Sequence, residues 1–207
     1  MTISGRTVVA SGADATPSKT CALSRELASQ REGVLDAAVI RSSGVEGGCR
    51  PIADLNRIAF GSDAEGALIA RLRDDGLVLV ERVALDADGL VGHILFSRLD
   101  VGIDGRTVSS AALAPMAVRP DRHRQGIGSR LVQDGLAELR RIGCEAVIVL
   151  GHPGYYPRFG FSAAVAERLD TPFRGASFMG LELIPGALDG QAGSVTYPNA
   201  FGIARKS

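Results

Sequence analysis

The sequence predicts an α/β protein in which helices cover a single mixed β-sheet. Short apolar segments typical of strands alternate with segments whose apolar residues recur every three or four positions, and no internal repeat is visible. The chain has 207 residues, of which 45% are hydrophobic. That is enough for one domain with a substantial core, which excludes global disorder.

The expected elements of the first half are a strand, two amphipathic helices and two strands: residues 37–41, 47–60, 62–76, 77–85 and 90–96. Asp88-Gly89, between the two later strands, predicts a hairpin turn. Residues 1–34 show only a weak helical pattern among Ser, Thr, Ala and Gly. We assign them to an N-terminal extension of doubtful order and residues 35–207 to the domain.

The expected elements of the second half are a strand, a long helix and two further strands: residues 109–118, 126–142, 145–150 and 178–184. The helix is the clearest element, because Ile127, Leu131 and Leu139 recur on one face. Residues 145–150 are mostly apolar, which predicts a strand buried on both faces. Tyr197 lies near a last strand.

Charge is balanced over the whole chain, with 23 Lys and Arg against 23 Asp and Glu. This disfavours a protein whose main task is binding nucleic acid, because phosphate backbones need a basic excess. The charge is nevertheless uneven. Residues 53–104 hold ten acidic and five basic side chains, a balance of −5, and residues 119–141 hold six Arg and three acidic residues, a balance of +3. We interpret this as a local site for one small anion, beside an acidic segment that suits a cationic partner.

The three cysteines, Cys21, Cys49 and Cys144, are widely spaced, and no Cys or His spacing of a zinc site occurs, so no metal is expected. This usage is typical of a reducing compartment. The N-terminus lacks the pattern of a signal peptide, and no segment has the roughly 18 apolar residues of a membrane span. The sequence therefore predicts a cytoplasmic protein without a membrane partner.

The segment with the most chemical content joins residues 109–118 to the helix at 126–142. Three Arg precede Gly126-Ile127-Gly128 at the predicted helix start. Glycines there let a ligand approach the backbone, and the free amide N–H groups and the helix dipole favour an anion. The Lys-Ser or Lys-Thr of a Walker loop is absent, and Leu131 stands where a Rossmann fingerprint needs glycine. The alternative is a tight turn with solvent-exposed Arg.

Four short segments together resemble the GNAT superfamily of acetyl-CoA-dependent N-acetyltransferases, and within it the bacterial YhbS-like branch. They are Gly92-His93-Ile94-Leu95-Phe96-Ser97, Leu113-Ala114-Pro115-Met116-Ala117-Val118, Gln125-Gly126-Ile127-Gly128-Ser129 and Tyr155-Tyr156-Pro157-Arg158-Phe159-Gly160-Phe161. The late residues 178–183 also fit, and the resemblance covers residues 37–201. It implies an α/β (α+β) fold with a mixed, mostly antiparallel sheet of about six to seven strands, flanked by helices and containing a splayed central strand pair.

The resemblance implies that acetyl-CoA is the co-substrate and that backbone amides of the glycine loop wrap its pyrophosphate. The residues thereby assigned to the cofactor site are Met116, Ala117, Val118, His123, Arg124, Gln125, Gly126, Ile127, Gly128 and Ser129. His123 departs from the Gln or Arg that opens the family pattern, so Arg122 or Arg124 is expected to supply side-chain charge. Pantetheine would pair with residues 116–118 as an added strand, and Pro115 suits a bulge that opens a slot beside residues 145–150.

The resemblance also places Tyr156 where the family carries the tyrosine that protonates the departing CoA thiolate. A phenol with a pKa near 10 can donate that proton or a hydrogen bond. Tyr155 is the neighbouring candidate, and the alternative for both residues is packing beneath the helix.

The attacking amine must also lose a proton, and several groups could take it. His152 follows a strand end beside the tyrosines and is the preferred substrate contact. His93, Glu81 and Asp100 are further candidates, as is a water chain without a dedicated base.

The functional hypothesis is an N-acyltransferase that moves an acetyl or similar short acyl group from acyl-CoA to a small-molecule or peptide amine. We favour direct transfer in a ternary complex, because Cys144 follows a helix in a structural position. The alternatives are a non-catalytic module that binds CoA or acyl-CoA, and a nucleic-acid binder that uses residues 119–141. A homodimer is compatible with the resemblance.

Overall fold

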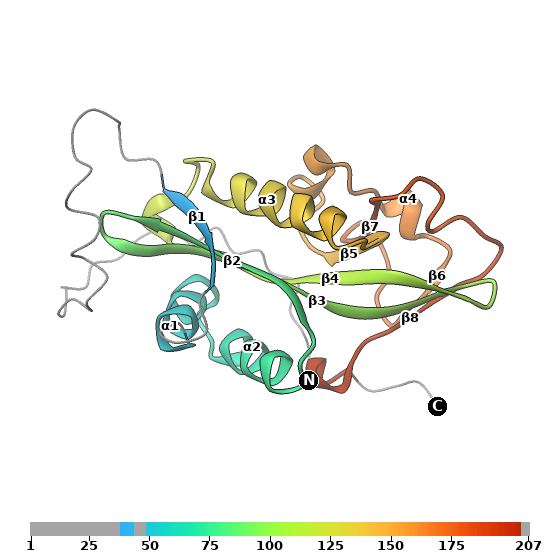
Figure 1. Cartoon of the computed structure of the whole chain (residues 1–207), viewed down its shortest axis with the longest axis horizontal. Helices are drawn as coiled ribbons and strands as arrows, with labels where there is room; N and C mark the ends of the chain where they lie inside the picture. The colour runs from blue at the N-terminus through green and yellow to red at the C-terminus, as the bar shows by residue number, and fades with distance from the viewer. Residues whose placement is uncertain (1–37, 44–48, 204–207) are drawn as a thin grey trace.

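The computed structural model describes residues 38–43 and 49–203. Within these residues a single eight-stranded sheet is covered on one face by helix α3 (Ile127–Arg141) and on the other by α1 (Cys49–Phe60) and α2 (Ala64–Asp74), as Figure 1 shows. The α/β class is confirmed, with eight strands in place of the expected six to seven. The extension assigned to residues 1–34 lies outside the described residues.

The strands along the main path of the sheet are, in spatial order, β1 (Val39–Ser42), β2 (Val78–Asp86), β3 (Gly89–Ile103), β4 (Arg106–Val118), β5 (Ala146–Leu150) and β7 (Phe178–Glu182). Neighbours on this path are antiparallel except β4 and β5, which are parallel. At the far end, β8 (Gly193–Thr196) pairs with β3, and β6 (Leu169–Asp170) pairs with β8. The prediction of a mostly antiparallel mixed sheet is therefore confirmed.

The hairpin of β3 and β4 is longer than the sequence analysis predicts. β3 continues past Phe96 to Ile103, and β4 begins at Arg106 after a two-residue turn. In the added part of β3 the exposed Arg98 and Asp100 alternate with buried apolar residues, the pattern of a strand with one solvent-facing side. The short helix α4 (Ala163–Ala166) and strand β6 were not predicted, because each is too short to show a period.

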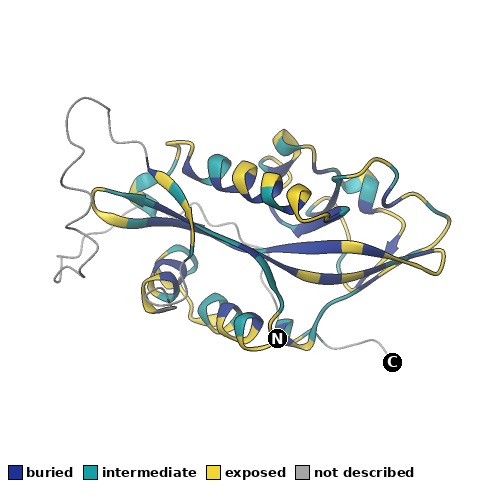
Figure 2. Ribbon diagram, in the orientation of Figure 1, coloured by how far each residue is buried: buried dark blue, intermediate teal, exposed yellow. Residues whose placement is uncertain are grey.

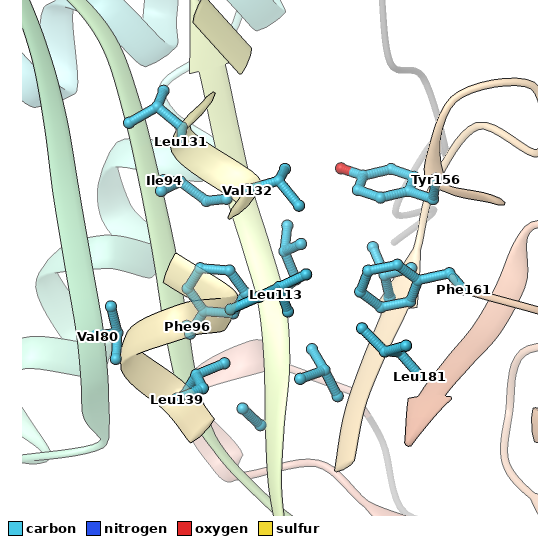
Figure 3. Packing of buried hydrophobic residues seen from close by; sticks show 14 of the residues in the cluster. Val80, Ile94, Phe96, Leu113, Leu131, Val132, Leu139, Tyr156, Phe161 and Leu181 are labelled. Carbon is cyan, nitrogen blue, oxygen red and sulfur yellow. The ribbon is translucent and has the colours of Figure 1, made fainter. Parts of the chain in front are cut away.

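Two apolar layers hold the helices to the sheet. On one face, Phe96 and Leu113 pack against Val132 and Leu139 of α3 (Figure 3). On the other face, residues of α1 and α2 pack against sheet residues: Ile52, Ile69, Leu72, Val83 and Leu95. Both sets of helices turn their buried sides toward the sheet and their exposed sides to solvent (Figure 2). The sheet is thus a middle layer with a separate apolar cluster on each face.

Candidate active site

Strands β4 and β5 lie side by side at one end and separate at the other. Their parallel register ends where Leu113 faces Val149, although β4 continues through Met116–Val118. The register of β4 against β3 shifts at this point, where the peptide bond between Ala114 and Pro115 is cis. The predicted bulge and splayed strand pair are therefore present. Within the described residues, Met116–Val118 has no strand partner on the β5 side.

The loop that follows β4 places backbone amides at the start of α3. It forms one turn of 3-10 helix, η3 (Pro120–Arg122), and then adopts left-handed backbone at Arg124 (φ 63°) and Gly126 (φ 78°). Glycine takes this conformation readily, whereas a side chain such as that of Arg124 makes it costly. Gly126 is the N-cap of α3, so the first amides of a 15-residue helix have no intrahelical acceptor.

The arginines of this loop differ in their partners. The Arg122 Nε atom lies 2.8 Å from Asp86 Oδ2 at the end of β2, and the guanidinium also contacts Asp88 and Asp121. Arg119 donates to Asp121 at 2.7 Å, and this hydrogen bond holds the pKa of the Asp121 carboxyl below its usual range. Three carboxylates therefore neutralise these two arginines. Arg124 is exposed, and within the described part of the chain its side chain has no ion pair.

His123 does not contribute a side chain to the amides of the helix start. Its Nε2 lies 2.9 Å from the carbonyl oxygen of Val118, so the imidazole turns back and donates to the end of β4. Of the residues considered for the side-chain charge, Arg124 is the one that remains unpaired.

Tyr155 and Tyr156 are adjacent in sequence but have different surroundings. The Tyr155 hydroxyl lies near Ser129, 2.8 Å from the position that a Cβ would take on Gly128. The guanidinium of Arg158 stacks 4.7 Å from the centre of the Tyr155 ring. Gly128 thus leaves the room that this phenol fills at the start of α3.

Tyr156 is 4% exposed and begins the turn η4 (Tyr156–Phe159). Its ring lies against the backbone of Gly151, where a Cβ would stand 2.1 Å from Cε2, and contacts Phe161 edge-on at 5.6 Å. Figure 3 shows its hydroxyl directed toward Val132 of α3. Burial raises the pKa of Tyr156 well above its ordinary value, so the phenol carries its proton at neutral pH.

His152 lies in the same loop as the tyrosines, as the sequence predicts. It is exposed, and its Nδ1 accepts a hydrogen bond from the Gly154 amide at 3.0 Å. The structure gives this imidazole a role in the turn after β5, and a contact with substrate stays a prediction.

A second polar cluster lies on the α1 face of the sheet and was recognised only in part from the sequence. His93 Nε2 lies 2.8 Å from Glu81 Oε1, and His93 Nδ1 lies 3.4 Å from Asn56 Nδ2. Glu81 also accepts from Arg73 at 2.6 Å and from Ser43 at 2.5 Å. Burial alone would raise the pKa of Glu81, but the hydrogen bonds from His93 and the other donors outweigh it and lower that pKa to about 2. Asn56 was missed; the signal was a polar residue on the apolar face of a predicted helix.

The buried His93 should make stability depend on pH. Burial lowers the pKa of His93 below 6.5, although the Glu81 carboxylate opposes this shift. Below pH 6.5 the unfolded chain therefore binds a proton that the folded chain does not, so stability is present above this pH and falls as pH falls. In urea unfolding we expect a loss of up to about 1.4 kcal/mol per pH unit as the pH falls below 6.5.

His93→Gln should flatten this slope, whereas the exposed His152→Gln should retain it. An unchanged slope in His93→Gln would show that another group controls the pH dependence.

Cys144 has the environment of a structural thiol. It is buried, and its Sγ contacts the carbonyl oxygen of Ala146 at 3.3 Å. Burial raises the pKa of this thiol, which disfavours the reactive thiolate. Cys21 and the side chain of Cys49 lie outside the described residues.

Two further features concern the described residues as a whole. No helix among them has both the length and the apolar character to cross a membrane. Within the same residues, no three His, Cys, Asp or Glu side chains gather in the manner of a metal site.

The mixed sheet thus opens between two parallel strands, and a glycine-led helix start lies beside the opening. Residues 51–161 match the Acetyltransferase (GNAT) family, and the chain belongs to this family. It is 37% identical over 150 residues to the uncharacterized N-acetyltransferase YhbS of Escherichia coli (strain K12), a match that spans 71% of this chain and 89% of that protein.

Two solved structures extend this similarity to the fold. The crystal structure of Escherichia coli YhbS in complex with CoA matches with a TM-score of 0.74 and 34% identity, over 84% of this chain and 96% of that one. A GNAT acetyltransferase from Brucella melitensis in complex with acetyl-CoA matches with a TM-score of 0.64 and 30% identity, over 80% and 98%.

Proposed function

We propose that the protein is an N-acyltransferase that moves an acetyl group from acetyl-CoA to a primary amine within a ternary complex. The observation that carries the proposal is the joint placement of three features: the open edge of β4, the unpaired amides at the start of α3, and the buried phenol of Tyr156. The binding of CoA and acetyl-CoA by the two structural neighbours supports the choice of donor.

The phosphates of CoA would bind at the start of α3. The amides from Arg124 to Ser129 and the dipole of α3 favour a pyrophosphate there, and Arg124 adds a positive side chain. Pantetheine would extend along Met116–Val118 and complete hydrogen bonds that β5 leaves unmade. The thioester would then lie in the opening between the two strands.

The transfer needs a nucleophile and a proton for the leaving group. The amine nitrogen attacks the thioester carbonyl carbon, the C–S bond breaks, and the CoA sulfur leaves with the electron pair. Tyr156 supplies the proton or a hydrogen bond to that sulfur, and the amine releases its own proton to water. The buried, protonated thiol of Cys144 fits direct transfer better than an acyl-enzyme.

Asp86→Asn should weaken acetyl-CoA binding because Asp86 holds Arg122 against the base of the loop. We expect the dissociation constant from calorimetric titration to rise about five- to tenfold, from the loss of a shielded charge-assisted contact. Asp134→Asn is the matched control. It removes the ion pair between Asp134 Oδ1 and Arg82 Nε, 2.6 Å apart, which joins α3 to β2 outside the loop. Equal effects of the two variants would contradict a role of Asp86 in shaping this loop.

The proposed activity is tested by measuring free CoA thiol released from acetyl-CoA in the presence of polyamines, amino acids, aminoglycosides and peptide N-termini, with the acetylated product identified by mass. We expect amine-dependent thiol release and a mass increase of one acetyl group. Acetyl-CoA binding without transfer to any amine would favour the second candidate, a CoA-binding module. Nucleic-acid binding is disfavoured because Arg119, Arg122 and Arg141 are paired with carboxylates.

A further inference from the structure

A buried polar atom on the α1 face of the sheet lacks a hydrogen-bond partner among the described residues. Asn56 is fully buried, and within the described residues its Oδ1 accepts no hydrogen bond. Leaving a buried acceptor unpaired is costly, and natural structures do so rarely without a reason. The proposed reaction, as described so far, does not use this atom.

The orientation of the Asn56 amide is determined by its neighbours. Nδ2 lies 2.8 Å from the carbonyl oxygen of Ile52, which can only accept, so the nitrogen and not the oxygen must face it. Its other N–H faces Nδ1 of His93 at 3.4 Å. His93 donates Nε2–H to the ionised Glu81 at 2.8 Å, which leaves Nδ1 as an acceptor. Both N–H groups of Asn56 are therefore engaged, and Oδ1 points to neither of these partners.

The position of Asn56 in the fold relates this oxygen to the opening between the strands. His93 pairs across β3 and β4 with Ala117, the middle residue of the open β4 edge. Paired residues share one face of a sheet. Met116 and Val118 point to the opposite face, where their side chains come within 3.8 and 3.5 Å of the Cβ position of Gly128 in α3. Asn56 thus lies behind the open edge, on the face that α1 covers.

A ligand that follows the proposed binding mode would reach this face with its reacting end. Its phosphates lie at the start of α3, on one face of the sheet, and its thioester enters the opening between β4 and β5. The amine must then approach from the other face, since α3 covers the first. On that face lies Asn56 Oδ1, a buried oxygen that has no hydrogen-bond donor among the described residues.

We propose that Asn56 binds the acceptor substrate: its Oδ1 accepts a hydrogen bond from the N–H of the primary amine that attacks the thioester. His93 and Glu81 are positioning residues, which act by holding the Asn56 amide in this orientation. Because the N–H meets Oδ1, the nitrogen lone pair stays available for the carbonyl carbon. This inference rests on the proposed function.

The test uses two CoA derivatives, so it does not depend on knowing the natural acceptor. In one, the CoA sulfur is bonded to the methylene carbon of an N-methylacetamide group. Its amide N–H then lies near the position that the nitrogen of the attacking amine would occupy. The other carries methyl acetate, which has the same shape without the N–H. By calorimetric titration of the wild-type protein, we expect the amide to bind about tenfold more tightly than the ester, the value of one buried hydrogen bond.

Variants then assign the preference to a residue. Asn56→Leu should reduce the tenfold ratio to about one, and Glu81→Gln should lower it. Ser97→Ala is the matched control, because Ser97 Oγ is also buried without a partner among the described residues. Ser97 faces Ala112, where β4 still pairs with β5, so its removal should retain the ratio.

The outcomes separate this inference from the function on which it rests. Equal affinities of the two derivatives for the wild-type protein overturn the Asn56 proposal, and this result needs no variant to fold. A tenfold ratio that survives in Asn56→Leu overturns it as well, because the N–H then has another partner. Failure of unmodified CoA to bind contradicts the proposed function itself.

Discussion

Tyr156→Phe should lower kcat about 100-fold or more, because the CoA thiolate then leaves without a proton donor. The substitution removes one oxygen atom and keeps the ring that packs against Gly151 and Phe161, so the fold should persist. The dissociation constant for acetyl-CoA should stay within about twofold of the wild-type value, since the phosphates bind elsewhere. The measurement is steady-state transfer to the best amine of the screen, with calorimetric titration of acetyl-CoA alongside.

Tyr155→Phe is the matched control for this prediction. The Tyr155 hydroxyl lies at the start of α3 beside Gly128 and Ser129, so its loss should alter acetyl-CoA affinity more than kcat. If Tyr156→Phe retained full kcat, Tyr156 would be a packing residue. If only Tyr155→Phe lost kcat, the proton donor would be its neighbour.

Gly135→Ala should destabilise the protein by about 2 kcal/mol. Gly135 lies in α3, and a Cβ there would stand 2.2 Å from Cε2 of the fully buried Phe96. This overlap lies in a packed layer, so either the ring or the helix must move. Alanine favours helix over glycine by about 1 kcal/mol, which reduces the effect but does not reverse it. Urea unfolding at constant pH measures the change.

The double variant Gly135→Ala with Phe96→Leu identifies the cause. The smaller leucine makes room for the added methyl group. Gly135→Ala should therefore lower stability less in the Phe96→Leu protein than in the wild-type protein. The expected coupling is about 1 kcal/mol or more. Additive effects would contradict the Phe96 contact as the source of the instability.

The sequence predicted most elements of the fold because their patterns are local. The helix at 126–142 and the buried strand at 145–150 were found within a residue or two, from the apolar period in one and the apolar run in the other. The length of β3 was underestimated because its far half exposes one face and carries charges. The splayed strand pair was expected from Pro115 and the family resemblance, and the end of the β4–β5 register confirms it.

Contacts between distant segments could not be predicted in the same way. Asp86 and Asp88 belong to the acidic part of the chain, yet they lie at the β2–β3 turn and pair with Arg122 of the loop after β4. Part of the acidic segment is therefore neutralised by the basic segment. Fewer carboxylates are left to attract an amine than the balance of −5 over residues 53–104 implied. The two adjacent tyrosines differ in their surroundings because Gly128 leaves room for one and Gly151 leaves room for the other. These spaces depend on how three elements pack together, which the sequence alone does not show.

Calorimetric titration of the wild-type protein with acetyl-CoA tests the central claim most directly. The account predicts saturable binding of one acetyl-CoA per chain, with a dissociation constant between about 1 μM and 1 mM. Arg124→Ala should weaken that binding, because Arg124 is the unpaired cation beside the amides at the start of α3. The absence of any binding heat at millimolar acetyl-CoA would contradict the account.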